Sequence, residues 1–404
     1  MRKLVDLTTF PPPWLSYPES LTLFSELELA GGQTRFVGGC VRDALLGQVS
    51  DDLDVCTDLP PETVLDILSK AGLKVIPTGL KHGTVTALIG EHKYEITTLR
   101  VDVQSFGRHA DVAFTKSWLE DAARRDFTIN ALYMEISGAL HDYHGGMSDL
   151  ENGIVQFIGD ADIRIKEDYL RVLRFFRFYG RYGTGAPDSR SFGACANASD
   201  KLGDLSAERI SRELLQVLGA TDPIKALAQM QNAGILNALL IDEISLSTLE
   251  EMLKLPIVTD PVNRLSALLG GRVELVKKIS RKLRLSAKAE KRLVLMCREC
   301  VPPDLNLLAQ KSRLYKMGAQ AFKDQVLLSW SQRPEGNGFV AYIELADSWA
   351  IPQCPVSGKD LLKIGIVAGP GLGIILKQIE EVWIESDFTI SQSDLLSQVA
   401  LGDP

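Results

Sequence analysis

The amino-acid sequence predicts an α+β protein in which a small α/β head, built on a mixed sheet, is followed by a long all-helical remainder. Strand-like and helical segments alternate between about residues 31 and 150, which is typical of an α/β unit. After residue 150 the strand signal fades, and apolar residues recur mostly at helical spacing. Hydrophobic residues make up 45% of the 404 residues, enough to fill the cores of several structural units.

We expect five parts along the chain. The first is an N-terminal arm with one helix, and the second is the head. Three helical parts follow, because prolines and a Gly/Ser/Ala-rich connection at 184–200 interrupt the helical pattern. In chain order the expected boundaries are 1–30, 31–150, 151–220, 221–345 and 346–404.

Local sequence signals predict the elements of the head. Runs rich in Val, Ile and Thr favour strands, and a pair of prolines favours the start of a helix. The expected helices are residues 20–32, 41–47 and 61–72, and the expected strands are 34–39, 52–57, 74–77, 83–90, 93–100 and 131–137. Residues 101–113 are expected to form a loop and residues 142–150 a turn.

Composition and charge narrow the class of protein. The net charge of −8 gives no sign of a general nucleic-acid binder, although a mean charge can hide a local patch. Segment 272–298 carries ten Lys and Arg against two Glu, and the sequence leaves open whether it is a solvated helix face or a phosphate-binding surface. The chain has no apolar run of membrane-spanning length, and its start contains an Asp and a run of three prolines. We therefore expect a cytoplasmic protein with no membrane partner.

Two aspartates in the stretch FVGGCVRDALLGQVSDDLDV point to a metal site. Asp52 and Asp54 are two residues apart on an expected strand, so their side chains face the same way. Two like charges side by side are costly unless a cation lies between them. Few and hard oxygen ligands suit Mg²⁺, which completes its coordination with water and substrate phosphate. A D-x-D pair alone is a weak signal, because solvated pairs of this kind are common.

The glycine pair before the aspartates indicates phosphate binding. Gly38 and Gly39 end one strand where a helix begins, so bare backbone can approach phosphate oxygens there. Arg42 lies on the first turn of that helix and could donate to a triphosphate. Together with Asp52 and Asp54 as catalytic and metal-binding residues, this spacing favours phosphoryl or nucleotidyl transfer.

These residues carry a resemblance to a known family. The pattern G-G-x-V-R-D-x-L-L-G followed by D-x-D resembles the head of the class II tRNA nucleotidyltransferases, which include CCA-adding enzymes and bacterial poly(A) polymerases. Four further segments resemble the family's later motifs in the same order, at 124–131, 142–150, 167–178 and 207–214. The resemblance implies a nucleotidyltransferase head, then a helical neck with a nucleotide-template motif, a helical body and an RNA-binding tail. The C-terminal half resembles the family only in helical content and order.

The resemblance assigns base selection to the segment EDYLRVLRFFRF. Asp168 and Arg171 match the family's template pair, in which a carboxylate accepts from the base's amino group and an arginine donates to a ring nitrogen. Cytosine and adenine both offer that pattern, whereas uracil and guanine would leave buried polar groups unpaired. Arg174 and Arg177 follow at the same spacing of three, and on one helix face they would support the triphosphate or the pair.

The segment RRDFTINA supplies further nucleotide contacts. Arg125 is expected to contact phosphate and Asp126 to orient a partner, although Arg124 could take the place of Arg125. Asn130 could hold the sugar. Glu95 is either a third acid near the metals or an ordinary exposed strand residue.

Two glycine-containing segments remain open. In the family's CCA-adding branch a loop in the region of 101–113 is associated with the switch from C to A, and Gly107 with Arg108 suits a hinge and a contact. Near the C-terminus, glycines 369, 371 and 373 precede a helix, whose start could hold an RNA phosphate or could be a tight helix–turn–helix.

The resemblance implies an enzyme that adds C, C and A to the 3′ end of tRNA, using CTP, ATP and Mg²⁺. The alternatives are a poly(A) polymerase, a partial CC-adding or A-adding enzyme, and an inactive RNA-binding protein. The segment PTGLKHGTVTAL lacks the paired basic residues of the poly(A) polymerases, which favours tRNA. No obligate protein partner is evident from the sequence.

Overall fold

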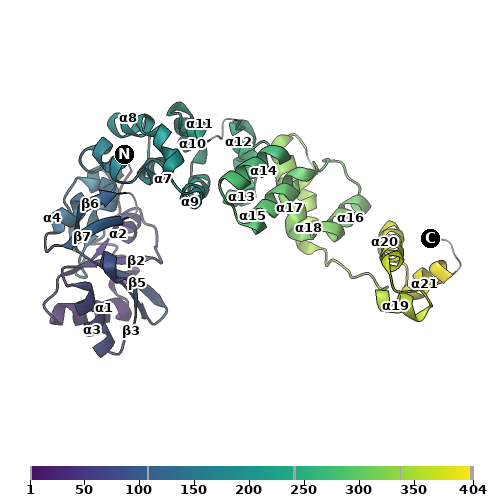
Figure 1. Cartoon of the computed structure of the whole chain (residues 1–404), viewed down its shortest axis with the longest axis horizontal. Coiled ribbons are helices and arrows are strands. Elements are labelled where there is room, and N and C mark those ends of the chain that lie inside the picture. Colours follow the sequence, from purple (N-terminus) through teal and green to yellow (C-terminus); the bar gives the residue numbers. More distant parts are fainter. Residues whose placement is uncertain (1, 107–108, 240–242, 337, 401–404) are drawn as a thin grey trace. The chain divides into compact units, whose positions relative to one another are not determined.

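The computed structural model describes residues 2–106, 109–239, 243–336 and 338–400. The chain forms two compact units, Met1–Asp242 and Glu243–Pro404. The first unit contains a seven-stranded sheet and neighbouring helices, and the second unit is helical throughout its described residues (Figure 1). The α/β head and the helical remainder are therefore as predicted, while the finer division into five parts stays a prediction.

The head sheet is mixed. Its strand order is β3-β4-β5-β2-β1-β8-β9. All neighbouring strands are antiparallel except β2 and β5, which run parallel. The strands are β1 (Thr34–Val37), β2 (Leu53–Thr57), β3 (Lys74–Gly79), β4 (Thr84–Ile89), β5 (His92–Thr98), β8 (Leu132–Met134) and β9 (Leu140–Asp142).

Helices α1 (Pro18–Leu29) and α3 (Pro61–Lys70) pack near the sheet because each has one apolar face. Leu23 and Leu27, one helical turn apart on α1, are completely buried. The Phe36 ring on β1 lies 4.6 Å from that of Phe24 and 4.3 Å from that of Trp14, measured between centroids. This core fixes the strand that ends at the glycine pair.

Residues 101–113 do not form the expected loop. They form most of a two-stranded antiparallel sheet, β6 (Arg100–Phe106) and β7 (His109–Phe114). The physical reason is visible in the sequence, because apolar and polar residues alternate through VDVQ (101–104) and HADV (109–112). Gly107 and Arg108, predicted as a hinge and a contact, lie outside the described residues.

The expected turn at 142–150 is only partly a turn. Helix α5 (Gly146–Asn152) begins inside it. The Asp142 carboxylate accepts hydrogen bonds from the backbone N–H groups of Gly146 and Met147, both at 2.9 Å, and so satisfies the start of the helix.

The expected connection at 184–200 contains helix α8 (Ser189–Asn197). The Asp188 carboxylate caps it by accepting from the Ser191 backbone N–H at 2.8 Å. The small residues that suggested a flexible connection instead allow close packing, since Ala194 and Cys195 are buried.

Helices follow the sheet within the first unit, and α7 is central among them. Its buried residues include Phe175, Phe176 and Tyr179, and it packs against α9 and α10 (Figure 1). Further helices of the first unit are α4 (Trp118–Ala123), which precedes β8 in the chain, and α6 (Ala161–Glu167), α7 (Leu170–Tyr182), α9 (Ala207–Leu218), α10 (Pro223–Asn232) and α11 (Ile235–Ala238), which follow the sheet.

The second unit holds two hydrophobic centres. One surrounds α17, where Phe322 and Val326 are fully buried, and the other gathers around Trp383 near the C-terminus. Its helices are α12 (Leu246–Lys254), α13 (Pro261–Leu268), α14 (Val273–Lys282), α15 (Ala287–Arg298), α16 (Leu307–Met317), α17 (Ala319–Gln332), α18 (Phe339–Ser348), α19 (Gly358–Lys363), α20 (Pro370–Glu385) and α21 (Gln392–Ala400). Across the part of the chain that the structure describes, no helix combines the length and apolar character needed to cross a bilayer.

The basic segment 272–298 forms α14 and α15. Part of its charge is paired: Arg272 lies 2.6 Å from Glu243, and Arg292 lies 2.7 Å from Asp324.

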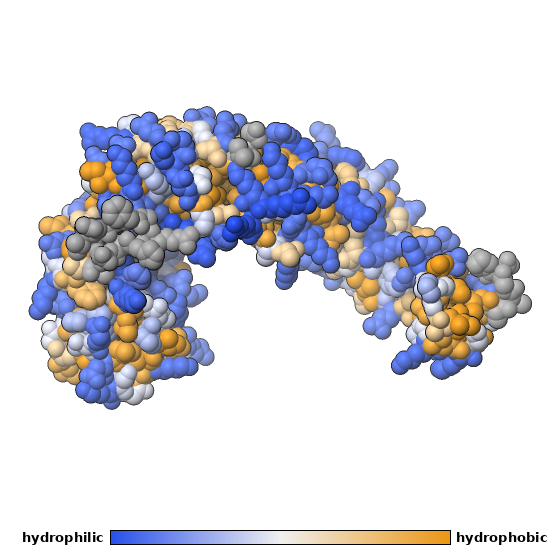
Figure 2. Space-filling view, viewed as in Figure 1, coloured by the Kyte–Doolittle hydropathy of each residue, from blue (hydrophilic) through white to orange (hydrophobic). Residues whose placement is uncertain are grey.

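Figure 2 shows a largely hydrophilic surface over the middle of the chain and an apolar patch over the last helices. The exposed apolar residues there include Val367 and Ile374.

Candidate active site

A pocket of about 560 Å³ lies in the first unit, where the head sheet meets α2 (Gly39–Leu45), α7 and α9. Nine of the eleven predicted site residues line it, and five further residues complete the wall. Its lining residues are Gly38, Gly39, Arg42, Asp54, Arg124, Arg125, Asp126, Asn130, Asp168, Leu170, Arg171, Arg174, Phe178 and Arg209. Of the predicted residues, Arg177 lines a neighbouring pocket, and Asp52 is exposed and lines neither.

The glycine pair makes the turn from β1 into α2. Gly38 has a φ of 71°, a left-handed conformation that favours glycine. Its backbone N–H donates to the Leu132 carbonyl at 3.0 Å, which ties the turn to β8. A Cβ on Gly38 would lie 3.7 Å from a terminal nitrogen of Arg125, and one on Gly39 would lie 3.7 Å from a terminal nitrogen of Arg42. Bare backbone therefore lies between two arginines at the pocket wall.

Three carboxylates lie near the start of β2. Asp54 is paired in register with Glu95 on the parallel strand β5, and Asp52 immediately precedes β2. Burial raises the pKa of Asp54 to about 6, and the charges of Glu95 and Asp52 add to this, against the opposing effect of Arg125. Glu95 is itself half-exposed and pairs with Lys93 at 2.5 Å. The strand predicted at 52–57 thus begins one residue later than expected, and Asp52 lies immediately before its first residue.

A cation would relieve this repulsion, so the residues present fit a divalent metal. Within the described ranges, no three Asp, Glu, His or Cys side chains gather closely enough to hold a metal ion alone. Asp52 and Asp54 would therefore depend on water and nucleotide oxygens to complete the coordination, as is usual for Mg²⁺.

Asp126 links the head to α7. It accepts hydrogen bonds from Arg174 Nε at 2.8 Å, from Asn130 Nδ2 at 3.0 Å and from the Phe127 backbone at 2.9 Å. Burial raises the pKa of Asp126, but the Arg174 charge and these hydrogen bonds outweigh burial and lower the pKa to about 2. Asp126 is thus a permanent anion that orients Arg174 and Asn130 at the pocket wall.

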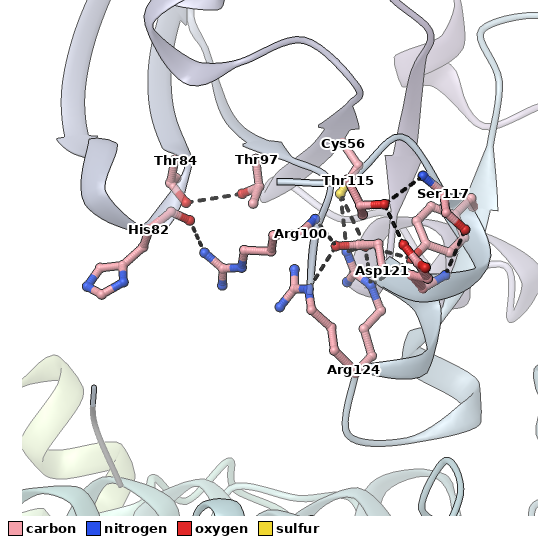
Figure 3. A network of polar contacts seen from close by, with 12 residues as sticks. Cys56, His82, Thr84, Thr97, Arg100, Thr115, Ser117, Asp121 and Arg124 are labelled. Atoms are coloured by element: carbon pink, nitrogen blue, oxygen red, sulfur yellow. Dashed lines mark hydrogen bonds and ion pairs between the residues drawn. The ribbon is translucent and has the colours of Figure 1, made fainter. Parts of the chain in front are cut away.

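Asp121 is a site residue that sequence reasoning missed. It is fully buried and contacts both arginines of the RRD segment, and Figure 3 shows its contact with Arg124. Its carboxylate accepts from Arg124 Nε at 2.8 Å, Arg125 Nη2 at 3.0 Å and the Tyr133 hydroxyl at 2.8 Å. Burial raises the pKa of Asp121, but the two arginine charges outweigh it and lower the pKa to about 2. The signal was available, because Asp121 lies three and four positions before the arginines on a helical stretch.

Arg124 and Arg125 both line the pocket, and their contacts differ. Arg124 pairs only with Asp121 among the contacts above, whereas Arg125 also donates to the Tyr133 hydroxyl at 3.0 Å and lies 3.2 Å from the Cys56 sulfur. Arg125 also lies beside Gly38, so it is the arginine nearer to the glycine turn.

Asp168 does not lie on the same helix as the three arginines. It has an extended backbone between α6 and α7, and its carboxylate accepts from the Leu170 backbone N–H at 3.1 Å. The second carboxylate oxygen accepts from Arg209 Nη2 at 2.6 Å. Sequence reasoning missed Arg209, although the segment AERISREL contains it.

Arg171, Arg174 and Arg177 do share α7, and each pairs most closely with a different carboxylate. Arg171 pairs with Glu167 and donates to the Arg164 carbonyl at 2.7 Å. Arg177 lies 3.3 Å from Glu213, with its guanidinium 4.6 Å from the Phe178 ring centroid. One face of α7 therefore carries a row of three arginines, which runs from the end of the helix near Asp168 to the neighbouring pocket.

The similarity of this chain to known proteins extends beyond the residues of the pocket. Residues 34–156 match the family model described as the poly A polymerase head domain. Over 389 residues the chain is 34% identical to CCA tRNA nucleotidyltransferase 1, mitochondrial, of Danio rerio, covering 91% of this chain and 87% of that protein. It is 34% identical to the protein of the same description from Homo sapiens, covering 95% and 92%. It is 30% identical to the CCA-adding enzyme of Lactobacillus johnsonii, covering 95% and 97%.

The solved structures agree over most of the chain. The crystal structure of the Bacillus stearothermophilus CCA-adding enzyme in complex with CTP matches with a TM-score of 0.76 and 27% identity, covering 91% of this chain and 93% of that one. The Thermotoga maritima CCA-adding enzyme complexed with tRNA matches with a TM-score of 0.63 at 19% identity, which bears on the fold alone. The shared fold therefore includes the helical second unit, for which the sequence offered no motif.

Proposed function

Because the chain belongs to the family of CCA-adding tRNA nucleotidyltransferases, we propose that it completes tRNA by adding C, C and A from CTP and ATP. One observation supports this most directly. A single pocket joins the glycine turn, the Asp54 carboxylate and the Asp168–Arg171 pair, which are the parts that phosphate binding, catalysis and base selection require.

The proposed reaction is a nucleotidyl transfer. The oxygen of the tRNA 3′ hydroxyl bonds to the α-phosphorus of the nucleotide, and the bond from that phosphorus to the bridging oxygen breaks. Pyrophosphate leaves, and the hydroxyl proton passes to water. The chain's own part is to place these groups in line and to balance the charge of the phosphates.

Asp52 and Asp54 are the residues that would hold a divalent cation, and we propose Mg²⁺. Such an ion supplies activation of the hydroxyl and charge for the leaving pyrophosphate. Burial and nearby carboxylates raise the pKa of Asp54 to about 6, which is the electrostatic reason that this site favours a cation.

The phosphates would lie against Gly38, Gly39, Arg42 and Arg125. Arg42 is almost fully buried, and its guanidinium is fixed by Asp43 at 2.9 Å and lies 4.3 Å from the Tyr182 ring centroid. Arg125 is held by Asp121 and Tyr133. Both cations are thus preorganised, so little conformational entropy is lost when a triphosphate binds.

Base selection would lie at the other end of the pocket. The Asp168 carboxylate would accept from the amino group of cytosine or adenine, and Arg171 would donate to the neighbouring ring nitrogen. Uracil and guanine would present an oxygen to the carboxylate and leave it unpaired. Arg209 donates to one oxygen of the Asp168 carboxylate and so fixes the orientation of that carboxylate at the pocket wall.

We propose the cytoplasm as the cellular location. Two animal relatives are described as mitochondrial, so the location calls for a direct test. Fractionation of cells that express the chain, with detection in the cytosolic and organellar fractions, provides it.

Stepwise extension of a tRNA tests the proposed function. The substrate is a transcript that ends at the discriminator base, with Mg²⁺ and each nucleotide alone, then CTP with ATP. We expect two additions with CTP and a third only when ATP is also present. A stop at two under all conditions would indicate a CC-adding enzyme, and a long ladder with ATP alone would indicate a poly(A) polymerase. No extension at all would contradict the enzymatic proposal.

A further inference from the structure

A second pocket lies beside the proposed nucleotide pocket and shares Arg42 and Phe178 with it. It has a volume of about 440 Å³, and we call it the arginine pocket. Three arginines and no acidic residue are among its lining residues, which are Arg42, Gln48, Arg177, Phe178, Arg181, Gln216, Gly219, Ala220 and Thr221. Helices α2, α7 and α9 supply most of this lining.

The arginine pocket carries an excess of positive charge. Two carboxylates contact its arginines: Arg42 and Arg181 share Asp43, and Arg177 contacts Glu213. Glu213 is also 4.0 Å from Arg174, so it is not reserved for the pocket. Three lining cations therefore face at most two neutralising anions.

The ion pairs of the two outer arginines are long. Arg181 lies 3.6 Å from Asp43 with its side chain 49% exposed, and Arg177 lies 3.3 Å from Glu213. A guanidinium has five N–H donors in a planar fork, so each arginine keeps donors for a ligand. Burial lowers the pKa of Arg177, and the charges of Arg174 and Arg42 lower it further against the opposing effects of Glu213 and Asp126.

The orientation of the nucleotide decides which anion reaches this pocket. The proposed base contacts and phosphate contacts come from different elements of the nucleotide pocket: Asp168 and Arg171 come from the α6–α7 junction, and Arg42 with the glycine turn comes from the start of α2. The β- and γ-phosphates are the part of the nucleotide farthest from the base. They would therefore lie nearest to Arg42, whose guanidinium belongs to the walls of both pockets.

We propose that the arginine pocket receives the pyrophosphate that leaves after each nucleotide addition. This inference rests on the proposed function, because that reaction supplies the pyrophosphate. The chemistry fits: pyrophosphate is a compact polyanion with oxygens for bidentate donors from Arg177 and Arg181. A site that holds the leaving group outside the nucleotide pocket would free that pocket for the next nucleotide while the tRNA stays bound.

Product inhibition tests the proposal on the full chain. CTP addition to a tRNA transcript is measured at several pyrophosphate concentrations, for the wild type, Arg181→Gln and Arg181→Lys. We expect Arg181→Gln to raise the inhibition constant for pyrophosphate about three- to tenfold, the effect of losing one partly exposed charge-assisted contact. The KM for CTP should rise by a smaller factor, and Arg181→Lys should lie between the wild type and Arg181→Gln.

Arg212→Gln is the matched control, because Arg212 is an exposed arginine on α9 that lines neither pocket. It should leave the inhibition constant unchanged. An unchanged constant in Arg181→Gln would overturn the proposal. So would an equal rise in the KM for CTP, which would assign the pocket to the bound triphosphate, or a rise only in the KM for tRNA, which would assign it to an RNA phosphate.

Calorimetric titration with pyrophosphate separates this proposal from the proposed function, since it requires no turnover. The wild type and Arg212→Gln should bind pyrophosphate with equal affinity, and Arg181→Gln should bind it about three- to tenfold more weakly. Equal binding by all three proteins would contradict the pocket assignment whether or not the chain extends tRNA.

Discussion

Arg209 donates a hydrogen bond to the carboxylate of Asp168 at 2.6 Å, across 41 positions of sequence. Both side chains are about one quarter exposed, so the pair lies at the wall of the pocket rather than beneath it. Arg209 thus positions the carboxylate that is proposed to read the base, and we do not propose that Arg209 contacts the base itself.

Loss of Arg209 should weaken base selection more than catalysis. In Arg209→Ala the Asp168 carboxylate keeps its hydrogen bond from the Leu170 backbone but loses its second partner. We expect the ratio of CTP to UTP incorporation to fall about three- to tenfold, the size of one charge-assisted contact. Competition assays with both nucleotides measure the ratio. Arg212→Ala on the same helix is the control, and an unchanged ratio in Arg209→Ala would contradict the role.

Asp168→Asn should weaken the discrimination against UTP. An amide can donate to the uracil oxygen that a carboxylate refuses, so we expect UTP incorporation relative to CTP to rise by about tenfold or more. The same competition assay applies, with thermal unfolding to verify that the variant folds. A uniform loss of activity with all nucleotides, at an unchanged ratio, would show that Asp168 does not read the base.

Asp52→Asn and Asp54→Asn should each lower kcat about a hundredfold or more, because each removes charge from the proposed cation site. Removal of divalent metal by a chelator should abolish addition, and Mg²⁺ should restore it. Asp51→Asn is the matched control, since Asp51 is exposed and lines neither pocket. Retained tRNA affinity alongside lost activity separates an enzyme from a passive RNA binder, for which all three variants would behave alike.

Asp121 should contribute stability that depends on pH. Its pKa is lowered to about 2 from the ordinary value of 3.8, so the contribution is fully present above pH 3.8 and is lost as the pH falls toward 2. The shift corresponds to roughly 2 kcal/mol in the free energy of unfolding. We therefore expect the wild type to lose more stability than Asp121→Asn between pH 4 and pH 2, measured by denaturant unfolding of the full chain.

The same substitution should also affect nucleotide binding, which a purely structural residue would not. Arg125 loses its charged partner in Asp121→Asn, so the KM for CTP should rise while the KM for tRNA stays close to that of the wild type. An equal rise in both constants would indicate general damage to the fold instead.

The sequence predicted the head well because its elements carry local signals. The apolar face of α1, the prolines before α3 and the β-branched runs of β4 and β5 each specify one structure without help from the rest of the chain. The prediction of a loop at residues 101–113 was wrong, because β6 and β7 pair with each other there and only short alternating runs in the sequence indicate them.

The site was predictable where spacing carries chemistry and not where partners are distant in sequence. Gly38, Asp54 and Arg171 stand in recognisable patterns, and the pocket brings them together. Arg209 supports Asp168 from another helix, 41 positions away, and only the folded chain shows that contact. Asp121 lies three and four positions before its arginines, so its spacing did carry a local signal. The arginine pocket is likewise formed by residues from three helices, so no single segment of the sequence predicts it.

The most direct test of the proposed function is to sequence the 3′ ends that the purified protein produces. The substrate is a tRNA that lacks its terminal nucleotides, with all four nucleoside triphosphates and Mg²⁺ present. We predict that nearly all new ends read C, C, A and then stop, because the protein rather than an RNA strand selects each base. Tails of mixed composition, or runs of A without preceding C, would contradict it.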